Sequence, residues 1–391
     1  MMGQGPRKLV LLGATGSIGR SAQDVIAHSP PGTFEVVAVA GGRDVVALAE
    51  VARRFKVRFA AVADQTCAGA LKEALSGSGI ASGAGPSAVV EAALYEADMV
   101  VGAIAGAAGV LPTHAALAAG RTVALANKEC LVCAGTPFMR TAAKSGAKIL
   151  PMDSEHNAIF QALGGEPIGN VERMTLTASG GPFRTWSAEK IAAATPEQAL
   201  AHPNWSMGPK VTIDSASLMN KGLELIEAYH VFGIEAERLD VLVHPQSIVH
   251  GLISFADGAV TAGMAVPDMR APIAHCLSYP DRVTTRAQRL DLAAIGTLTF
   301  EAPDLVRFPA LRVAMNAMRT GGSMPTVLNA ANEIAVAKFL SKEIYFNDIA
   351  TVVEKVCEEY SRTANAREPE SVEHALEIDE IARDLARRLA A

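Results

Sequence analysis

A glycine-rich turn near the start of the chain constrains its fold more than any other feature. Gly13, Gly16 and Gly19 follow the apolar run LVLL, and the sequence after them favours a helix. In a dinucleotide-binding fold, such glycines permit a tight turn, close approach of a pyrophosphate and close packing of helix against strand. Free N–H groups at the start of the helix attract the phosphates. The pattern predicts a nucleotide site, with a purely structural turn as the alternative.

The glycine turn opens a regular alternation of strands and helices within residues 8–150. After KLVLLG, the β-rich runs are FEVVAVAG, RFAAVA, MVVGAI, TVALA and AKIL, each followed by a Gly, Asn or Asp turn. Helical stretches separate these runs. Such alternation is typical of a parallel, doubly wound sheet. We therefore expect a Rossmann-like α/β domain over residues 1–152.

The remaining chain has a different texture. Loops rich in Pro, Gly, His and Trp alternate with the expected strands RMTLTAS, KVTI, VLVHPQSIVHGLISF and AVTAGMAV. This mixture predicts an α+β catalytic domain over residues 153–280 with long functional loops. Residues 281–303 have the character of a connecting arm. Four segments of helical periodicity then predict a C-terminal helical domain over residues 304–391.

Length and charge narrow the classes of partner. A chain of 391 residues is long enough for two or three domains. The net charge of −6 argues against a nucleic acid or an anionic membrane as partner. No signal peptide is evident, and the apolar residues 99–112 are too few to span a bilayer. We therefore expect a cytoplasmic protein that acts on a small molecule.

The five cysteines support a reducing compartment, because they are scattered and odd in number. Cys130 and Cys133 form a C-x-x-C pair. A zinc site would need a second pair or a nearby histidine, and neither accompanies them. Two small apolar side chains in a packed segment are therefore the favoured interpretation, with redox or metal use as the alternative.

The end of the second predicted strand bears on the choice of nucleotide. It carries Gly42, Arg43 and Asp44. An arginine at this place suits the 2′-phosphate of NADP, whereas an acidic residue suits the ribose hydroxyl of NAD. Because Arg43 comes first, NADP is favoured, although the adjacent Asp44 keeps NAD open.

Three acidic residues in two separate stretches predict a metal site. Asp153 and Glu155 lie two apart in PMDSEHN, where an extended backbone would direct both side chains to one face. Glu224 lies in MNKGLELIE. Three carboxylates with open positions suit Mg²⁺ or Mn²⁺, which prefer oxygen ligands. The alternatives are a helix cap for the first two residues and an exposed helical charge for Glu224.

The third acidic residue has polar neighbours suited to phosphate. We expect a helix to begin near Ser217, with Asp214 or Ser215 as its N-cap. Helical spacing then places Asn220 and Lys221 on the same surface as Glu224. Their N–H donors, near the start of a helix, predict a phosphate site beside the metal site.

Three loops complete the predicted site. Ser179 opens a Ser-Gly-Gly-Pro turn whose N–H groups suit an oxyanion. The segment HPNWSMG, which contains His202, Trp205 and Met207, has the make-up of a lid that expels water, with a buried structural Trp as the alternative. Lys128 follows the strand TVALA, at the edge of the sheet where ligands bind.

Taken together, these segments resemble the 1-deoxy-D-xylulose 5-phosphate reductoisomerase family. The matching stretches extend through nearly the whole chain, and HPNWSMG and MNKGLE are the most specific of them. The others are GATGSIGRSAQDVI, ALANKE, PMDSEHNAIFQ, TASGGPFR, VHPQSIVHG, VPDMRAPIAH and NAANEIAVAKFL. The resemblance implies an NADPH-dependent, divalent-metal reductoisomerase. Such an enzyme converts 1-deoxy-D-xylulose 5-phosphate to 2-C-methyl-D-erythritol 4-phosphate in the non-mevalonate isoprenoid pathway. A homodimer with a flexible flap is also implied.

The resemblance assigns roles to individual residues. Mg²⁺ or Mn²⁺, with Co²⁺ as a third candidate, would be bound by Asp153, Glu155 and Glu224. The substrate phosphate would be held by Ser179, Ser215, Asn220 and Lys221. Other substrate contacts would come from Lys128, Ser154, Glu155, His202, Trp205, Met207 and Glu224. The catalytic group would be Lys128, Asp153, Glu155, His202 and Glu224. NADPH would contact Thr15, Gly16, Ser17, Ile18, Gly42, Arg43, Asp44, Asn127, Glu129 and Gly208.

Two other functions stay open on the residues alone. A plain NADP-linked dehydrogenase would need the glycine turn but no metal, so chelation would leave its turnover intact. A non-catalytic NADP sensor or scaffold would use the C-terminal helices for partners. It would leave the carboxylates and phosphate donors unexplained, and it would oxidise no NADPH with any ketose phosphate.

Overall fold

The computed structural model describes residues 5–205, 207–363 and 366–390. The chain divides into two compact units, each assembled from non-contiguous segments. The first comprises the described residues of Met1–Cys130 together with Phe138–Asp153 and Asp268–Gln288. The second comprises Leu131–Pro137, Ser154–Pro267 and the described residues of Arg289–Ala391. The four-part division expected from the sequence stays a prediction.

The first unit contains a sheet of seven strands in the order β4-β3-β2-β1-β5-β6-β7. Every pairing in it is parallel, which confirms the predicted Rossmann-like fold. Chain order reverses beside β1, and this is where ligands bind in such sheets. The strands are β1 (Arg7–Leu12), β2 (Phe34–Gly41), β3 (Phe59–Val62), β4 (Ala81–Ala84), β5 (Met99–Gly102), β6 (Thr122–Leu125) and β7 (Ile149–Pro151).

Strand β4 is the one member of this sheet that the sequence analysis misses. Its sequence, ASGA, lacks the β-branched and aromatic residues that mark the other strands. It pairs with β3 through the register Phe59↔Ala81. A Cβ on Gly83 would lie 2.7 Å from the Cβ of Ala88, so close packing by the following helix favours small residues here.

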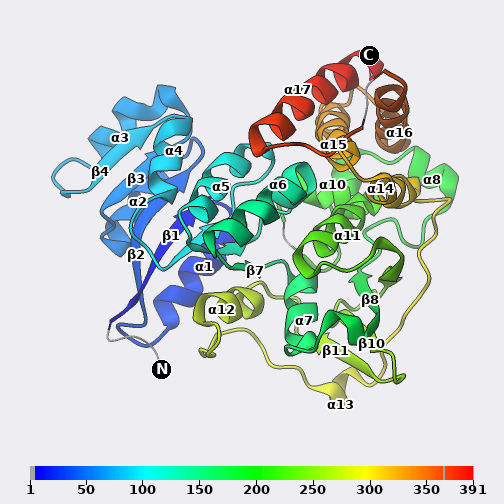
Figure 1. The fold of residues 1–391 in the computed structure, drawn as a ribbon, viewed down its shortest axis with the longest axis horizontal. Helices are drawn as coiled ribbons and strands as arrows, with labels where there is room; N and C mark the ends of the chain where they lie inside the picture. The colour runs from blue at the N-terminus through cyan, green and yellow to red at the C-terminus, as the bar shows by residue number, and fades with distance from the viewer. Residues whose placement is uncertain (1–4, 206, 364–365, 391) are drawn as a thin grey trace. The chain divides into compact units, whose positions relative to one another are not determined.

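Helices separate the strands of the first unit, as the βα alternation predicts (Figure 1). Helices α1 and α12 pack against each other although they are far apart in sequence. The helices are α1 (Ser17–His28), α2 (Val45–Phe55), α3 (Ala68–Ala74), α4 (Pro86–Ala93), α5 (Val110–Ala118) and α12 (Arg270–Ser278). Helix α6 (Glu129–Ser145) has a kink at Ala134 and contributes residues to both units.

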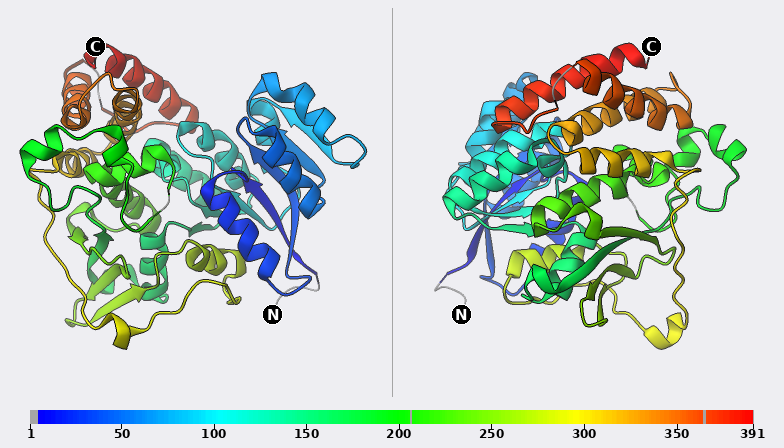
Figure 2. Two further views of the ribbon diagram at one scale, coloured as in Figure 1. Left: turned by 180° about the vertical axis from the view of Figure 1, so that it is seen from behind. Right: turned by 45° about the vertical axis from the view of Figure 1, so that its right-hand side comes forward.

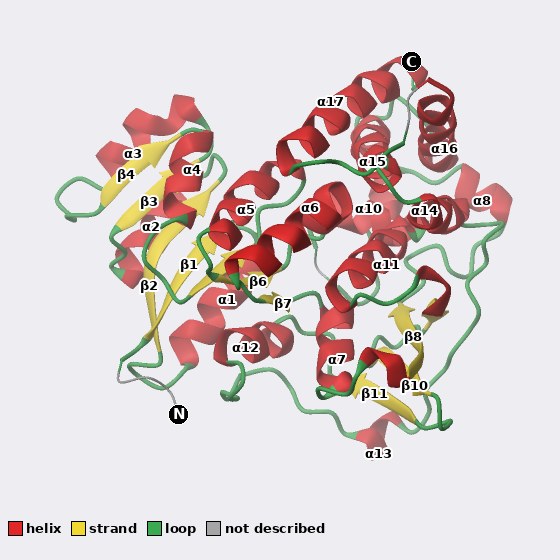
Figure 3. Cartoon of the chain, in the orientation of Figure 1, coloured by secondary structure: helices red, strands yellow, loops and turns green. Residues whose placement is uncertain are grey.

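The second unit contains a four-stranded sheet in the order β11-β10-β8-β9 (Figure 3). Its strands are β8 (Val171–Ala178), β9 (Leu239–Val243), β10 (Val249–Phe255) and β11 (Val260–Met264). Helix α7 (Ser154–Leu163) packs on β10 and β11. A Cβ on Gly263 would lie 2.5 Å from the Cβ of Ala158, and one on Gly251 would lie 2.8 Å from Ile159. Two glycines in the strands therefore let α7 lie close to the sheet.

Four other helices of the second unit pack on α15 (Met324–Leu340). This helix contacts α10 (Pro209–Ser217), α14 (Pro309–Thr320), α16 (Phe346–Thr363) and α17 (Val372–Leu389). In both views of Figure 2 the helices drawn from orange to red lie together. Helix α11 (Met219–Phe232) packs on α14, and a Cβ on Gly222 would overlap that of Ala314. The short helices are α8 (Ala188–Ala192), α9 (Pro196–Ala199) and α13 (Leu292–Ile295).

Two local predictions near the site are wrong. The segment KVTI, expected as a strand, lies in helix α10, which starts with Pro209 and has a Lys210–Asp214 ion pair one turn apart. Asp214 and Ser215 are therefore inside α10 instead of capping the next helix. Helix α11 starts at Met219, after Leu218 with a left-handed φ of 62°.

The segment PMDSE is also not extended throughout. Strand β7 ends at Pro151, and Glu155 already lies in the first turn of α7. Asp153 and Glu155 therefore do not share the face of a strand, and a strand-to-helix junction positions them instead.

Among the described residues, no helix combines the length and apolar character needed to cross a bilayer.

Candidate functional site

Three carboxylates meet at the junction that precedes α7. Asp153 directly precedes the helix, Glu155 lies in its first turn, and Glu224 is buried in α11. One oxygen from each of the three lies within 4.8 Å of the others. The fold thus brings together the residues that the sequence analysis proposed as metal ligands.

Two lysine ammonium groups partly neutralise the three carboxylates. The buried Lys221 Nζ lies 2.8 Å from Glu155 Oε1 and donates to Glu224 Oε2 as well. Burial alone would lower the pKa of Lys221, but the carboxylates of Glu155 and Glu224 raise it above its usual value. In the first unit, Lys128 Nζ lies 2.6 Å from Asp153 Oδ2. Positive charge is therefore already concentrated at the cluster.

This donor set fits a hard divalent cation. The grouped atoms are all carboxylate oxygens, the ligands that Mg²⁺ and Mn²⁺ prefer. Three carboxylates close together would repel one another without positive charge between them. The two lysines supply that charge here, and a divalent cation among the same oxygens would supply it in their place.

Donors for an oxyanion lie at the start of α11 and the end of α10. Asn220 Nδ2 donates to Glu224 Oε1, so Asn220 and Lys221 both converge on the buried glutamate. Ser215 is half-buried near the end of α10. A Cβ on Gly181, which has a φ of +65°, would lie 2.8 Å from the carbonyl oxygen of Ser215. The Ser179–Gly181 turn therefore rests directly against Ser215.

The histidine of the predicted lid orients Ser179. His202 Nδ1 accepts the backbone N–H groups of Asn204 and Trp205, at 3.1 and 2.9 Å. Its proton is thereby placed on Nε2, which lies 3.0 Å from Ser179 Oγ and donates to it. Ser179 Oγ also accepts the N–H of Gly181 at 3.1 Å. Because Ser179 Oγ already accepts two hydrogen bonds, its hydroxyl proton is available to donate to a ligand.

Burial is consistent with this neutral histidine, because it holds the pKa of His202 below its usual value. Trp205 is half-buried and packs edge-on against His250, with ring centroids 6.2 Å apart. Met207 is half-buried as well, and Gly208 is the N-cap of α10. Ser206, within the same motif, lies outside the described residues. The predicted lid therefore leads directly into the helix that carries Ser215.

Asn204, which the sequence analysis does not single out, ties this segment to the rest of its unit. Its Nδ2 donates to Pro245 O at 2.8 Å and to Ser247 Oγ at 2.9 Å. The loop that receives it begins at His244, whose backbone N–H donates to Ala178 O at the end of β8. A polar side chain beside the predicted Trp was the available signal.

The glycine turn of the first unit has the geometry that the sequence predicts. Gly13 has a φ of +83°, and a Cβ there would overlap the backbone of Ala103 after β5. A Cβ on Gly19 would overlap the carbonyl groups of Gly13 and Ala14. Helix α1 begins after Gly16, without a side-chain cap. Gly16 and Ser17 are exposed, and Thr15 and Ile18 are half-buried. Uncapped N–H groups at an exposed helix start suit a pyrophosphate.

The end of β2 separates the two candidates for nucleotide choice. Asp44 caps α2 by accepting the N–H of Ala47 at 3.0 Å. Arg43 is highly exposed and pairs with Asp64 at 2.8 Å, and Gly42 beside it is exposed too. The carboxylate has a structural task and the guanidinium projects into solvent, which favours recognition of a 2′-phosphate.

Asn127, Lys128 and Glu129 follow β6 and are all buried. Asn127 Nδ2 donates to the carbonyl groups of Ile104 and Gly106, in the loop after β5. Its Oδ1 accepts the N–H of Glu129 at 2.9 Å. Asn127 therefore joins the loops at the carboxyl ends of β5 and β6, the edge where a Rossmann-like sheet binds its ligand.

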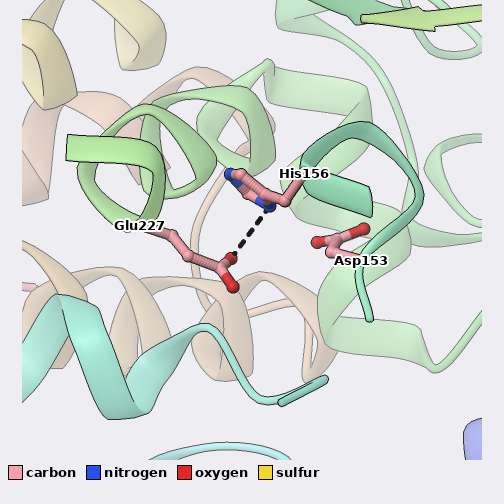
Figure 4. Close-up of side chains that lie close together, drawn as sticks. All are labelled: Asp153, His156 and Glu227. Carbon is pink, nitrogen blue, oxygen red and sulfur yellow. Dashed lines mark ion pairs between the residues drawn. The ribbon is translucent and has the colours of Figure 1, made fainter. Parts of the chain in front are cut away.

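A buried histidine and glutamate lie near Asp153 (Figure 4). His156, in α7, and Glu227, in α11, are both fully buried and lie 3.4 Å apart, between Nδ1 and Oε2. Asp153 is grouped with both of them. Glu227 is not among the site residues that the sequence predicts. Its spacing of three from Glu224 on one helix was the signal that could have found it.

The chain is similar to known proteins along nearly its whole length. Residues 9–135 match the family model for 1-deoxy-D-xylulose 5-phosphate reductoisomerase, 149–232 match its C-terminal domain, and 264–385 match the DXP reductoisomerase C-terminal domain. A 1-deoxy-D-xylulose 5-phosphate reductoisomerase of Rhodopseudomonas palustris strain TIE-1 is 56% identical, over 98% of this chain and 94% of that protein. One from Afipia carboxidovorans is 55% identical, over 99% and 95%.

Solved structures agree with this. The reductoisomerase from Zymomonas mobilis in complex with NADPH is 47% identical, with a TM-score of 0.91 over 98% of this chain and 99% of that one. A reductoisomerase in complex with NADPH, fosmidomycin and magnesium is 38% identical, with a TM-score of 0.92 over 98% of each chain.

Proposed function

The chain belongs to the 1-deoxy-D-xylulose 5-phosphate reductoisomerase family, and on that premise we propose that it converts 1-deoxy-D-xylulose 5-phosphate to 2-C-methyl-D-erythritol 4-phosphate. NADPH is the hydride donor, and a divalent cation is required. The observation that carries the proposal is the convergence of three carboxylates with the phosphate donors of α11. A plain dehydrogenase has no use for that arrangement.

Asp153, Glu155 and Glu224 would hold the cation. In a site of this kind a divalent cation polarises a ketone and a neighbouring hydroxyl oxygen as a Lewis acid. Magnesium accompanies the related structure with fosmidomycin, and Mn²⁺ and Co²⁺ are further candidates. Lys128, beside Asp153, would keep the local charge positive while the substrate oxygens bind.

Ser179, Ser215, Asn220 and Lys221 would bind the phosphate of the substrate. Ser179 is prepared for this by His202 and Gly181, which occupy its acceptor positions and leave its proton to donate. A phosphate held far from the reacting carbons contributes binding energy that orients them. Ser154, at the start of α7, would contact the substrate near the carboxylates.

Trp205 and Met207 would cover the bound substrate as parts of a flap. Their half-buried side chains in a loop bounded by Pro and Gly suit a segment that closes over a ligand. Closure would keep water away while the rearranged aldehyde is reduced. His202 connects the flap to Ser179, so phosphate binding and flap position would be coupled.

NADPH would bind the first unit at the turn between β1 and α1. Thr15, Gly16, Ser17 and Ile18 would contact its pyrophosphate. The remaining contacts would come from Gly42, Arg43, Asp44, Asn127, Glu129 and Gly208. The exposed Arg43 would bind the 2′-phosphate, which selects NADPH over NADH.

Three broader statements rest on family membership. We infer that the chain acts in the non-mevalonate isoprenoid pathway, that it forms a homodimer, and that it functions in the cytoplasm. Size-exclusion chromatography with light scattering tests the dimer directly.

The decisive test follows NADPH oxidation on addition of 1-deoxy-D-xylulose 5-phosphate and Mg²⁺. Turnover should require both, should stop with EDTA, and should return when excess Mg²⁺ is added. Turnover that survives full chelation would identify a metal-independent dehydrogenase instead. No oxidation with any ketose phosphate would favour a non-catalytic NADP sensor.

A further inference from the structure

A buried histidine joins the two helices that carry the candidate metal ligands. His156 is the third residue of α7, one position after Glu155, and its side chain is fully buried. Its Nε2 lies 2.8 Å from the main-chain oxygen of Glu224 in α11. Because a carbonyl oxygen only accepts, Nε2 carries a proton and donates it. The bond therefore runs from one ligand-bearing helix to the backbone of the other ligand itself.

The other ring nitrogen is directed to the same helix. Nδ1 lies 3.4 Å from Glu227 Oε2, three residues beyond Glu224 (Figure 4). One imidazole thus contacts α11 at two successive places, a main-chain oxygen and a carboxylate. The hydrogen bond from Nε2 fixes the ring against α11, and Nδ1, which makes no hydrogen bond to a described residue, faces the Glu227 carboxylate at ion-pair distance.

An ion pair also joins these two helices. It is the ion pair between Lys221 and Glu155, at 2.8 Å. A divalent cation among the carboxylates would compete with Lys221 for Glu155, so that pair weakens when the site is loaded. The bond from His156 uses a main-chain oxygen that no cation among the side chains displaces. It remains when the ion pair is exchanged.

We propose that His156 is a positioning residue for the metal site. Its hydrogen bond to the main-chain oxygen of Glu224 keeps Glu155 and Glu224 at the separation that a cation requires. This rests on the proposed function, because it presumes that the carboxylates bind a metal. Neighbouring residues that hold ligands in this way typically contribute a factor of about 10 to 100 to metal affinity.

The test compares two substitutions at one position, with Mn²⁺ as the probe. His156→Leu removes both contacts, whereas His156→Gln keeps an N–H donor in the region of Nε2. Titration of the purified full chain, with free Mn²⁺ followed by electron paramagnetic resonance, gives Kd without any turnover. We expect His156→Leu to raise Kd about 10- to 100-fold and His156→Gln to restore most of that loss.

A matched control is His114, a partly buried histidine of α5 in the first unit. It is bonded to Thr141 at 2.9 Å. His114→Leu removes a comparable contact away from the cluster and should leave the Mn²⁺ Kd unchanged. Far-UV circular dichroism and thermal unfolding report whether each variant is folded. If His156→Leu does not fold, His156→Phe replaces it: it fills the place of the ring without an N–H donor and should raise the Mn²⁺ Kd by a similar factor.

The outcomes separate this inference from the proposed function. A wild-type chain that does not bind Mn²⁺ contradicts the proposed function and the inference with it. Wild-type affinity in a folded His156→Leu variant contradicts the inference alone. Equal loss in the Leu and Gln variants contradicts it too, because the donated bond would then be irrelevant. Two Mn²⁺ ions per chain, one of them lost with His156, would make the histidine a ligand instead.

Discussion

The turn between β1 and α1 depends on the absence of side chains, whereas the cluster between α7 and α11 depends on charged side chains. At the turn, Gly13 and Gly19 matter for what they lack, since a Cβ on either would overlap backbone atoms. At the cluster, Glu155, Lys221 and Glu224 matter for the charge that their side chains carry. Added volume should therefore disrupt the first region, and removed charge should disrupt the second.

Loss of a ligand charge should have the largest effect. Glu224→Gln keeps the shape of the side chain but removes a carboxylate that Lys221 and Asn220 both contact. We expect kcat/KM to fall by more than about 100-fold, beyond the loss typical of residues that only support a ligand. The affinity for NADPH should not change. Steady-state kinetics and fluorescence titration measure the two quantities.

Glu172→Gln, on an exposed position of β8, is the matched control for this charge loss. It should retain wild-type activity. Wild-type activity in the Glu224→Gln variant would show that the carboxylate cluster is not needed for catalysis.

Added volume at the turn should have the next largest effect. Gly19→Ala places a methyl group against the carbonyl groups of Gly13 and Ala14. Such overpacking costs about 1–3 kcal/mol, and if this cost falls on the NADPH-bound conformation the Kd for NADPH should rise about 5- to 150-fold. Isothermal titration gives this Kd, and the Mn²⁺ Kd should stay constant.

Gly69→Ala tests whether the effect is local. Gly69 lies in α3 of the same unit, and a Cβ there meets no atom within 4 Å. This variant should bind NADPH as the wild type does. Equal weakening by both substitutions would show that any added methyl group disturbs the unit.

Removal of charge beside the turn should change selectivity by a smaller factor. Arg43→Ala should lower the preference for NADPH over NADH by about 10-fold, because hydrogen bonds to charged groups contribute about 1.5–3 kcal/mol. Asp44→Ala removes the cap of α2 and should lower the free energy of unfolding by about 1 kcal/mol. A change of coenzyme preference in Asp44→Ala, but not in Arg43→Ala, would reverse the assignment.

Acidification should produce the smallest effect. It should change substrate binding through His202 and leave NADPH binding at the β1–α1 turn unchanged. Protonation of His202 turns Nδ1 from an acceptor into a donor, which breaks its bonds with Asn204 and Trp205. Because burial lowers the pKa of His202, the ring stays neutral down to at least the usual value of about 6.5. KM for the substrate should therefore rise only below that pH, while the Kd for NADPH stays flat.

His202→Asn separates this effect from titration of the substrate phosphate. Asparagine can still accept the two N–H groups but does not become charged. Its KM should be higher than that of the wild type, because the bond to Ser179 is lost, and should follow only the substrate titration. If KM rises at low pH to the same extent in the wild type and in His202→Asn, His202 is not the group whose protonation causes the rise.

The two regions also differ in how far the sequence predicts them. The turn depends on residues that are adjacent in sequence. A strand, three glycines and a helix start follow one another, so the local sequence determines their geometry. The carboxylate cluster joins Glu155 to Glu224 across many residues. Residue chemistry and the family resemblance identified its members, but the period-two argument for PMDSE was wrong because α7 begins at Ser154.

What escaped prediction depends on tertiary context. KVTI is rich in residues typical of strands, yet Pro209 and the Lys210–Asp214 pair place it in α10. The sequence ASGA forms β4 only because a neighbouring strand pairs with it. For Glu227 and Asn204 a local signal existed, but their partners, His156 and the 244–247 loop, follow only from the tertiary structure.

The interleaving of the two units has a consequence for anyone who wishes to divide the protein. The chain passes from one unit to the other after Cys130, Pro137, Asp153, Pro267 and Gln288. No single cut in the gene therefore yields two self-contained halves. A fragment that ends at Asp153 would lack the α12 segment of its own unit and would retain residues 131–137 of the other. Division of this molecule would require several junctions to be rejoined at once.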